Sequence, residues 1–147
     1  MATMVSTTEE ALSPGSPAVA GSIRLILRLE GLAVAAVSAV LYAHTGASWW
    51  LFAALWLTPD LSMLGYLADV CMGARLYNAI HTYVAPAAMA VGALVLHQPV
   101  LIPFALIWVN HIGVDRLMGY GLKYPEGFGW THLGRLGGKR KQAMQAA

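Results

Sequence analysis

PVLIPFALIWVNHIGVDRLMG, residues 99 to 119, is the stretch that decides the fold. It has the length of about 20 residues that a helix needs to cross the hydrocarbon core of a bilayer. Its second half nevertheless carries Asn110, His111 and Asp115. A charged side chain near mid-membrane costs about 2.5 kcal/mol or more on insertion scales, so such residues normally face the inside of a helix bundle. The stretch therefore predicts a membrane helix whose polar face meets other helices.

The composition of the whole chain supports a membrane protein of one domain. Of its 147 residues, 58% are hydrophobic and 11% are charged, and the mean hydropathy is +0.60. The net charge of +2 comes from cations at the ends of apolar stretches and in the run 138–141, so we expect topology signals and no nucleic-acid partner. Cys71 is the one cysteine, which excludes a disulfide within the chain and a zinc ribbon.

Four apolar stretches are long enough to cross a bilayer, and the connections between them are short. Short connections place neighbouring helices antiparallel, so we predict an all-α, four-helix transmembrane bundle in up-down-up-down order. The first 21 residues are rich in Ser, Thr, Pro, Gly and Ala, as is typical of a disordered tail. The four apolar stretches are roughly 23–43, 48–68, 75–96 and 99–119. The chain thus divides into a disordered tail at 1–21, the bundle at 22–119 and a Gly-rich, basic membrane-interface tail at 120–147.

The positions of the cations predict the orientation of the bundle. Arg24 and Arg28 lie at the start of the first stretch, Arg75 lies in the second loop, and the remaining Lys and Arg residues follow position 115. The other two loops, around 44–48 and 97–99, contain no Lys or Arg. By the positive-inside rule we expect both termini in the cytoplasm.

Ionisable side chains recur at one depth in this topology. Glu30, Asp60, His81 and His111 each lie roughly 9 to 14 Å inside the cytoplasmic boundary, at about 1.5 Å of rise per residue. The outer half of the bundle contains no acidic or basic residue between its loops. Intramembrane ionisable residues mark functional sites by default, so this polar layer is the principal functional signal.

Spacing places several members of the layer on common helix faces. His111 and Asp115 are four residues apart, as are Tyr77 and His81, and Asn78 lies three residues before His81. Residues three or four apart are neighbours on a helix surface. The third and fourth stretches therefore each present a cluster of polar groups.

Two prolines lie beside the layer. Pro59 immediately precedes Asp60, and Pro86 lies within the third stretch. Each should loosen its helix one turn earlier and free a carbonyl that must find another partner. Kinks at this depth indicate room for a ligand.

The chemistry that best suits the layer is metal binding. Imidazole and carboxylate ligands without a thiolate fit Fe(II), Mn(II) or Zn(II). The third stretch offers Asn78 where a bundle di-metal site would have a carboxylate, which favours a single divalent ion. The candidate ligands are His81, His111 and Asp115, with Asp60 or Glu30 next in line.

Each assignment has a structural alternative. His111 and Asp115 could form a hydrogen-bonded pair that holds helices together, with Asp115 stabilised by Arg116 or Arg75. Glu30 could be a partner of a nearby arginine. Tyr77 could be an interfacial aromatic residue or a proton donor.

The tail after the fourth stretch interleaves glycine and aromatic residues with cations. It either lies along the inner headgroups or folds back over the cytoplasmic mouth of the bundle, where His132 could add a ligand. Residues expected in the layer or at its mouth, besides those already given, are Asn78, Asn110, Arg116, Tyr120 and His132.

The motifs Tyr77-Asn78-x-x-His81, Asn110-His111-x-x-x-Asp115-Arg116 and GYGLKYPEGFGWTHLGRLG (119–137) resemble a bacterial integral-membrane family, domain of unknown function 4260. The likeness covers roughly residues 24–138 and implies a small multi-helix protein of the bacterial inner membrane, without implying a mechanism. The motif residues of the family correspond to Asp60, Tyr77, Asn78, His81, His111, Asp115, Arg116, Tyr120, Lys123, Tyr124, Pro125, Phe128, Thr131 and His132.

Two functional hypotheses follow. The first is a metal-dependent membrane enzyme acting by hydrolysis or oxidation on a lipid-like or quinone-like molecule, in which Asp60 or Glu30 moves protons and Tyr77 assists. The second is a non-enzymatic bundle that binds a small ligand or passes an ion or a proton. To enclose a pore, four helices would have to form a homo-oligomer. In a third, structural version the layer serves helix association alone.

Overall fold

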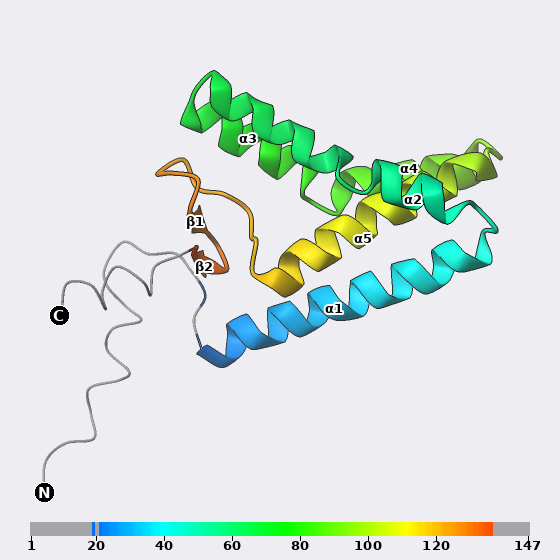
Figure 1. Ribbon diagram of the computed structural model, residues 1–147, viewed down its shortest axis with the longest axis horizontal. Coiled ribbons are helices and arrows are strands. Elements are labelled where there is room, and N and C mark those ends of the chain that lie inside the picture. Colours follow the sequence, from blue (N-terminus) through cyan, green and yellow to red (C-terminus); the bar gives the residue numbers. More distant parts are fainter. Residues whose placement is uncertain (1–18, 20, 137–147) are drawn as a thin grey trace, which may run out of the picture.

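The computed structural model describes residues 19 and 21–136, and almost all of the regular structure in this part is helical (Figure 1). The predicted disordered tail at 1–21 lies outside the described residues except for Val19 and Gly21, as does the basic end of the second tail, 137–147. The helices are α1 (Gly21–His44), α2 (Trp49–Leu55), the 3-10 helix η2 (Thr58–Leu67), α3 (Val70–Ile80), α4 (Val84–Val95), the 3-10 turn η3 (Pro99–Leu101) and α5 (Ile102–Met118).

Three helical segments are long and apolar enough to cross a membrane, namely Gly21–His44, Val70–Val95 and Pro99–Met118. This confirms three of the four predicted stretches and marks the chain as a membrane protein. Large apolar side chains cover the outside of α1, where Ile23, Leu25 and Val37 are each more than half exposed. Such a surface suits lipid rather than water. The up-down order across the membrane and its orientation stay predictions.

The second stretch differs from the expected continuous helix. It consists of the short helix α2 and then η2, with a break at residues 56–57, two residues before Pro59. The proline lies at the start of η2, where its missing N–H costs nothing, but it cannot continue α2. The break turns the chain, so Asp60 lies in a 3-10 helix rather than in a membrane-length α-helix.

The third stretch is broken in the same way. Helix α3 ends at Ile80 and α4 begins at Val84, with Pro86 in the first turn of α4. Because a proline ring clashes with the backbone one turn earlier, the break falls at residues 81–83. Both predicted kinks are therefore present, and both occur next to a member of the polar layer.

Helices α1 and α5 lie side by side in opposite directions and form the main helix pair (Figure 1). They approach closely because glycines face each other: a Cβ on Gly113 would lie 2.8 Å from Ala35 N and 2.9 Å from Gly31 O. Small residues at such contacts allow backbones in membranes to pack tightly. Asn110 fixes the pair further, since its Nδ2 donates to Ala35 O at 2.8 Å and to Ser38 Oγ at 3.2 Å.

The chain after α5 folds back onto the helices, one of the two arrangements expected for it. It contains a short antiparallel hairpin of β1 (Trp130–Thr131) and β2 (Gly134–Arg135). Asn78 attaches this segment to α3, because its Nδ2 donates to Lys123 O at 2.8 Å and its Oδ1 accepts from Lys123 N at 2.6 Å. In Figure 1 the hairpin lies at the end of the molecule where α1 begins and α5 ends.

Gly113→Ala should destabilise the protein by about 1–3 kcal/mol, because the added methyl group meets the backbone of α1 and the helices must separate. The matched control is Gly92→Ala in α4, where a Cβ would meet nothing within 4 Å. That change should stabilise its helix by up to about 1 kcal/mol. Thermal unfolding in detergent measures both, and equal melting temperatures for the two variants would contradict close packing at Gly113.

Candidate metal centre

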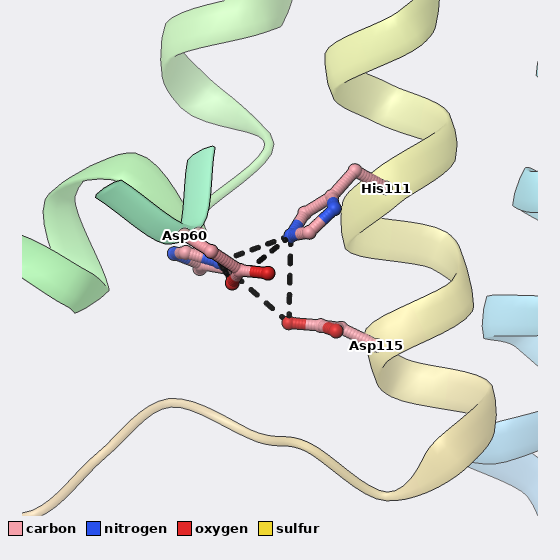
Figure 2. Close-up of side chains that lie close together, drawn as sticks. Asp60, His111 and Asp115 are labelled. Carbon is pink, nitrogen blue, oxygen red and sulfur yellow. Dashed lines mark hydrogen bonds and ion pairs between the residues drawn. The ribbon is translucent and has the colours of Figure 1, made fainter. Parts of the chain in front are cut away.

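Four side chains of the polar layer converge on one point. They are Asp60, His81, His111 and Asp115, and the one ligand atom that each offers lies within 4.8 Å of the other three. Figure 2 shows His111 and Asp115 projecting from α5 toward Asp60. Since Asp60 belongs to η2 and His81 follows α3, three separate elements supply the group.

The distances within this group suit a tetrahedral ion. His81 Nε2 lies 3.3 Å from His111 Nε2, 3.4 Å from Asp60 Oδ1 and 3.6 Å from Asp115 Oδ2. His111 Nε2 lies 3.5 Å from Asp60 Oδ1 and 3.9 Å from Asp115 Oδ2. Metal–ligand bonds of 2.0–2.2 Å place the corners of a tetrahedron about 3.3–3.6 Å apart. Five of the six distances lie within this range or a few tenths of an ångström above it, and the sixth, between the ligand atoms of Asp60 and Asp115, is within 4.8 Å.

His81 is oriented for ligation by its own backbone surroundings. Its Nδ1 lies 2.9 Å from Tyr77 O, and because a carbonyl can only accept, Nδ1 carries the hydrogen. In the neutral ring Nε2 then presents its lone pair to the other three groups. The ring of Tyr77 stacks on that of His81 with centroids 3.7 Å apart and an angle of 10° between planes. Outer contacts of this kind fix the tautomer and the ring orientation of metal-ligating histidines.

Aromatic side chains support the other ligands. Tyr77 also donates from its hydroxyl to Asp115 Oδ2 at 2.9 Å, so one tyrosine contacts both His81, which follows α3, and Asp115 of α5. Trp56 packs edge-on against His111, with ring centroids 5.0 Å apart, and donates from Nε1 to Asn110 Oδ1 at 2.9 Å. Asp115 and His111 thus have contacts outside the group, although His111 Nδ1 is buried without a hydrogen-bond partner in the described part of the chain.

The group is buried on the imidazole side and open on the carboxylate side. The side chains of His81 and His111 are each 1% exposed, whereas those of Asp60 and Asp115 are 33% and 15% exposed. A pocket of about 350 Å³ lies beside the group. It is lined by Trp56, Asp60, Met63, Tyr77, His111, Asp115, Met118, Tyr120 and Phe128.

Other predicted site residues lie near the group without joining it. Arg116 donates to His81 O at 2.9 Å and to Tyr120 O at 3.2 Å, so it supports the backbone of the site. His132 is not a member of the group of four, and its Nδ1 accepts from Leu122 N at 2.8 Å. Glu30 is exposed on α1 and lines a different pocket with Arg116 and His132. The predicted role of Glu30 as a ligand or proton carrier at the metal thus has no support from its position.

Sequence reasoning missed three residues that shape the site. Trp56 lies four residues before Asp60, a spacing that could have indicated a shared face. Trp108 lies three residues before His111 and donates to Ile80 O at 2.8 Å. Lys123, assigned only to topology and to the family motif, is 2% exposed, with its Nζ 3.7 Å from the Phe128 ring centroid and 3.0 Å from Phe128 O. Burial lowers the pKa of Lys123.

Comparison with known proteins agrees with the motifs of the polar layer and the tail. A family model described as domain of unknown function (DUF4260) matches residues 24–136. The chain belongs to the DUF4260 family. The resemblance expected over residues 24–138 is confirmed, and all four candidate ligands of this DUF4260 protein lie within the matched region. Among curated proteins and solved structures, no match was found.

His132 should make the folded tail of the DUF4260 protein sensitive to acid. Burial, and then the nearby charge of Arg116, lower the pKa of His132 from 6.5, so below about pH 6.5 the unfolded chain binds a proton that the folded chain does not. Stability is therefore lost as the pH falls through this range. We expect a smaller loss of melting temperature between pH 7.5 and 5.5 in His132→Asn, which retains an acceptor for Leu122 N–H without titrating. Equal losses in both proteins would contradict this role.

Proposed function

We propose that this membrane protein binds one divalent metal ion through Asp60, His81, His111 and Asp115 and uses it as a metal-dependent enzyme on a lipid-like or quinone-like molecule. The observation that carries the proposal is the convergence of four ligand atoms from three elements within 4.8 Å. Two imidazoles and two carboxylates without a thiolate favour zinc, iron(II) or manganese. The near-tetrahedral spacing favours zinc among these ions.

The contacts of the carboxylates support metal binding over a purely structural layer. A structural layer should pair Asp60 and Asp115 with arginine and leave no cavity. Within residues 19 and 21–136, the ion pairs of these two aspartates are all with His81 and His111, and a pocket opens beside them. The two carboxylates and a divalent ion would balance each other in charge, which removes the cost of burying unpaired charge at this depth.

The pockets around the group support an amphiphilic substrate. The pocket beside the group is lined by both carboxylates, and a second pocket of about 350 Å³ is lined by Leu55, Thr58 and Pro59 around the break before η2. The second pocket is lined mainly by apolar side chains, including Pro59 and Ile80, which directly precede Asp60 and His81. A molecule with a polar end and a hydrocarbon body would match this arrangement.

The residues of this chain have distinct roles in the proposed reaction. The bound metal would supply Lewis-acid or redox chemistry at the group. Asp60, the most exposed of the four ligands at 33%, faces the pocket and is placed to accept or deliver a proton there. Tyr77 holds Asp115 through its hydroxyl and so positions a ligand.

A second candidate function is a proton relay without a metal. It is favoured by the contact of 3.3 Å between His81 Nε2 and His111 Nε2, which lets the two rings share a proton. The partly exposed Asp60 would then connect the buried pair to the pocket. This candidate predicts the same loss of function on mutation of either histidine, but no bound metal.

Metal content distinguishes the two candidates. The detergent-purified wild type should contain close to one zinc, iron or manganese ion per chain, measured by plasma mass spectrometry. His81→Ala and His111→Ala should contain almost none, because each removes an imidazole ligand. His44→Ala and His97→Ala, which change exposed histidines outside the group, should retain the wild-type content. Wild type that binds no ion, even after the apo protein is offered each metal, would overturn the metal site.

Tyr77→Phe tests the outer contact to Asp115. The variant keeps the aromatic ring that stacks on His81 but removes the hydrogen bond of 2.9 Å to Asp115. Loss of such a contact typically weakens metal affinity by about 10- to 100-fold. Competition with a metal chelator measures the affinity, and an unchanged value would show that Tyr77 does not position the ligand.

The enzymatic part of the proposal needs its own test. Metal-loaded wild type and His111→Ala are incubated with extracted bacterial membrane lipids and quinones, and the mixtures are compared by mass spectrometry. We expect a lipid or quinone species to be consumed by the wild type alone. If the metal-loaded protein consumes no lipid or quinone species, with or without oxygen, the enzymatic part of the proposal is wrong and only the metal-binding part stands.

A further inference from the structure

A groove between α1 and α5, on residues outside the metal group, has a polar end and an apolar end. The polar end is a pocket of about 440 Å³, and the apolar end is a pocket of about 280 Å³. The two pockets share Ala33 and Val34 in their linings, so they adjoin along the helix pair. Their lining residues on α1 run from Leu27 to Leu41, about 21 Å at 1.5 Å per residue, which is similar to one leaflet of a bilayer with its headgroup.

The polar end contains hydrogen-bond donors suited to a phosphate. Arg116 lies in this pocket with two of its nitrogens on backbone carbonyls, and no carboxylate lies within 4.0 Å of it in the described part of the chain. His132 faces the same pocket, and since its Nδ1 accepts from Leu122 N–H, its Nε2 carries the hydrogen. Guanidinium and imidazole N–H groups are favourable donors to phosphate oxygens.

The polar end also contains an anion, Glu30. Glu30 lines the same pocket as Arg116, but the two side chains do not form an ion pair, and the Glu30 carboxylate accepts no hydrogen bond among residues 19 and 21–136. A pocket that holds a cation and an anion apart suits a ligand with both charges. A headgroup with a phosphate and an ammonium group has this charge arrangement.

The apolar end suits a hydrocarbon chain. It is lined by Ala33, Val34, Val37, Leu41, Leu106 and Val109, with Ser38 as its one polar side chain. The hydroxyl of Ser38 is occupied, because it donates to Ala35 O at 3.0 Å and accepts from Asn110 Nδ2. The walls of this end therefore offer contacts to methylene groups rather than hydrogen bonds.

We infer that the α1–α5 groove is a binding site for a zwitterionic phospholipid. The phosphate lies at Arg116 and His132, the ammonium group lies at Glu30, and an acyl chain follows α1 toward Leu41. Arg116 also donates to His81 O, so the headgroup contacts a residue that supports the candidate metal centre. The inference does not depend on a bound metal.

Lipid titrations of the detergent-purified full chain test this inference. Phosphatidylethanolamine should raise the melting temperature at lower concentration than phosphatidylglycerol with the same acyl chains, because phosphatidylglycerol lacks the ammonium group. Glu30→Gln should reduce this preference by about threefold, the scale of one partly exposed charge pair. His111→Ala should retain the preference, which separates the lipid site from the proposed metal site.

Two alanines on α1 provide a matched pair of variants for the acyl groove. Ala33→Phe fills the path between the two pockets and should weaken the apparent affinity for phosphatidylethanolamine about tenfold, as for the loss of roughly two buried methylene groups. Ala36→Phe adds the same ring at an exposed position that lines neither pocket and should have no effect. Unfolding without lipid shows that both variants are folded.

Three outcomes would overturn the inference. Equal affinity for the two lipids in wild type and Glu30→Gln would show that the site does not recognise a zwitterionic headgroup. Equal effects of Ala33→Phe and Ala36→Phe would show that no acyl chain binds along the groove. Stabilisation by inorganic phosphate or glycerophosphoethanolamine that matches that of the whole lipid, and is unchanged in Ala33→Phe, would assign the pocket to a free phosphate compound.

Discussion

Backbone polar groups in lipid must find partners within the protein, and the break after α3 is where this constraint acts most strongly. The carbonyls of Ile80 and His81 have no helical partner there, and they accept from Trp108 and Arg116 of α5. The same two bonds draw α5 against the break and bring His111 and Asp115 to His81. A requirement of the backbone thus assembles the side chains of the site.

One face of helix α5 packs against α1, and the other face carries two candidate metal ligands. Gly113 packs so closely against Gly31 and Ala35 of α1 that a larger residue there would clash with the α1 backbone. His111 and Asp115, two residues to either side of Gly113, lie on the other face because each residue advances about 100° around the helix. Helix α1 therefore contributes no candidate metal ligand but determines the direction in which α5 presents them.

Much of the site follows from sequence periodicity, and the rest depends on packing. The four-residue spacing of His111 and Asp115 predicts their shared face, and the prolines predict both breaks. Asp60 and Glu30 have a similar predicted depth in the membrane, so depth alone could not show which of them is a metal ligand. Glu30 directly precedes the buried Gly31, so the packing of α1 turns it away from the metal group. The burial of Lys123 could not be predicted, because the glycine-rich tail has no helical period and its position is set by Asn78.

The two hydrogen bonds between Asn78 and Lys123 join parts of the chain that are synthesised at different times. Lys123, Tyr120 and Phe128 follow α5 in the chain, so a ribosome makes them after all three candidate membrane spans. The pocket beside the carboxylates gains its last wall from Tyr120 and Phe128 only when the tail docks. During biosynthesis the four candidate ligands are accordingly made before the residues that enclose the pocket beside them.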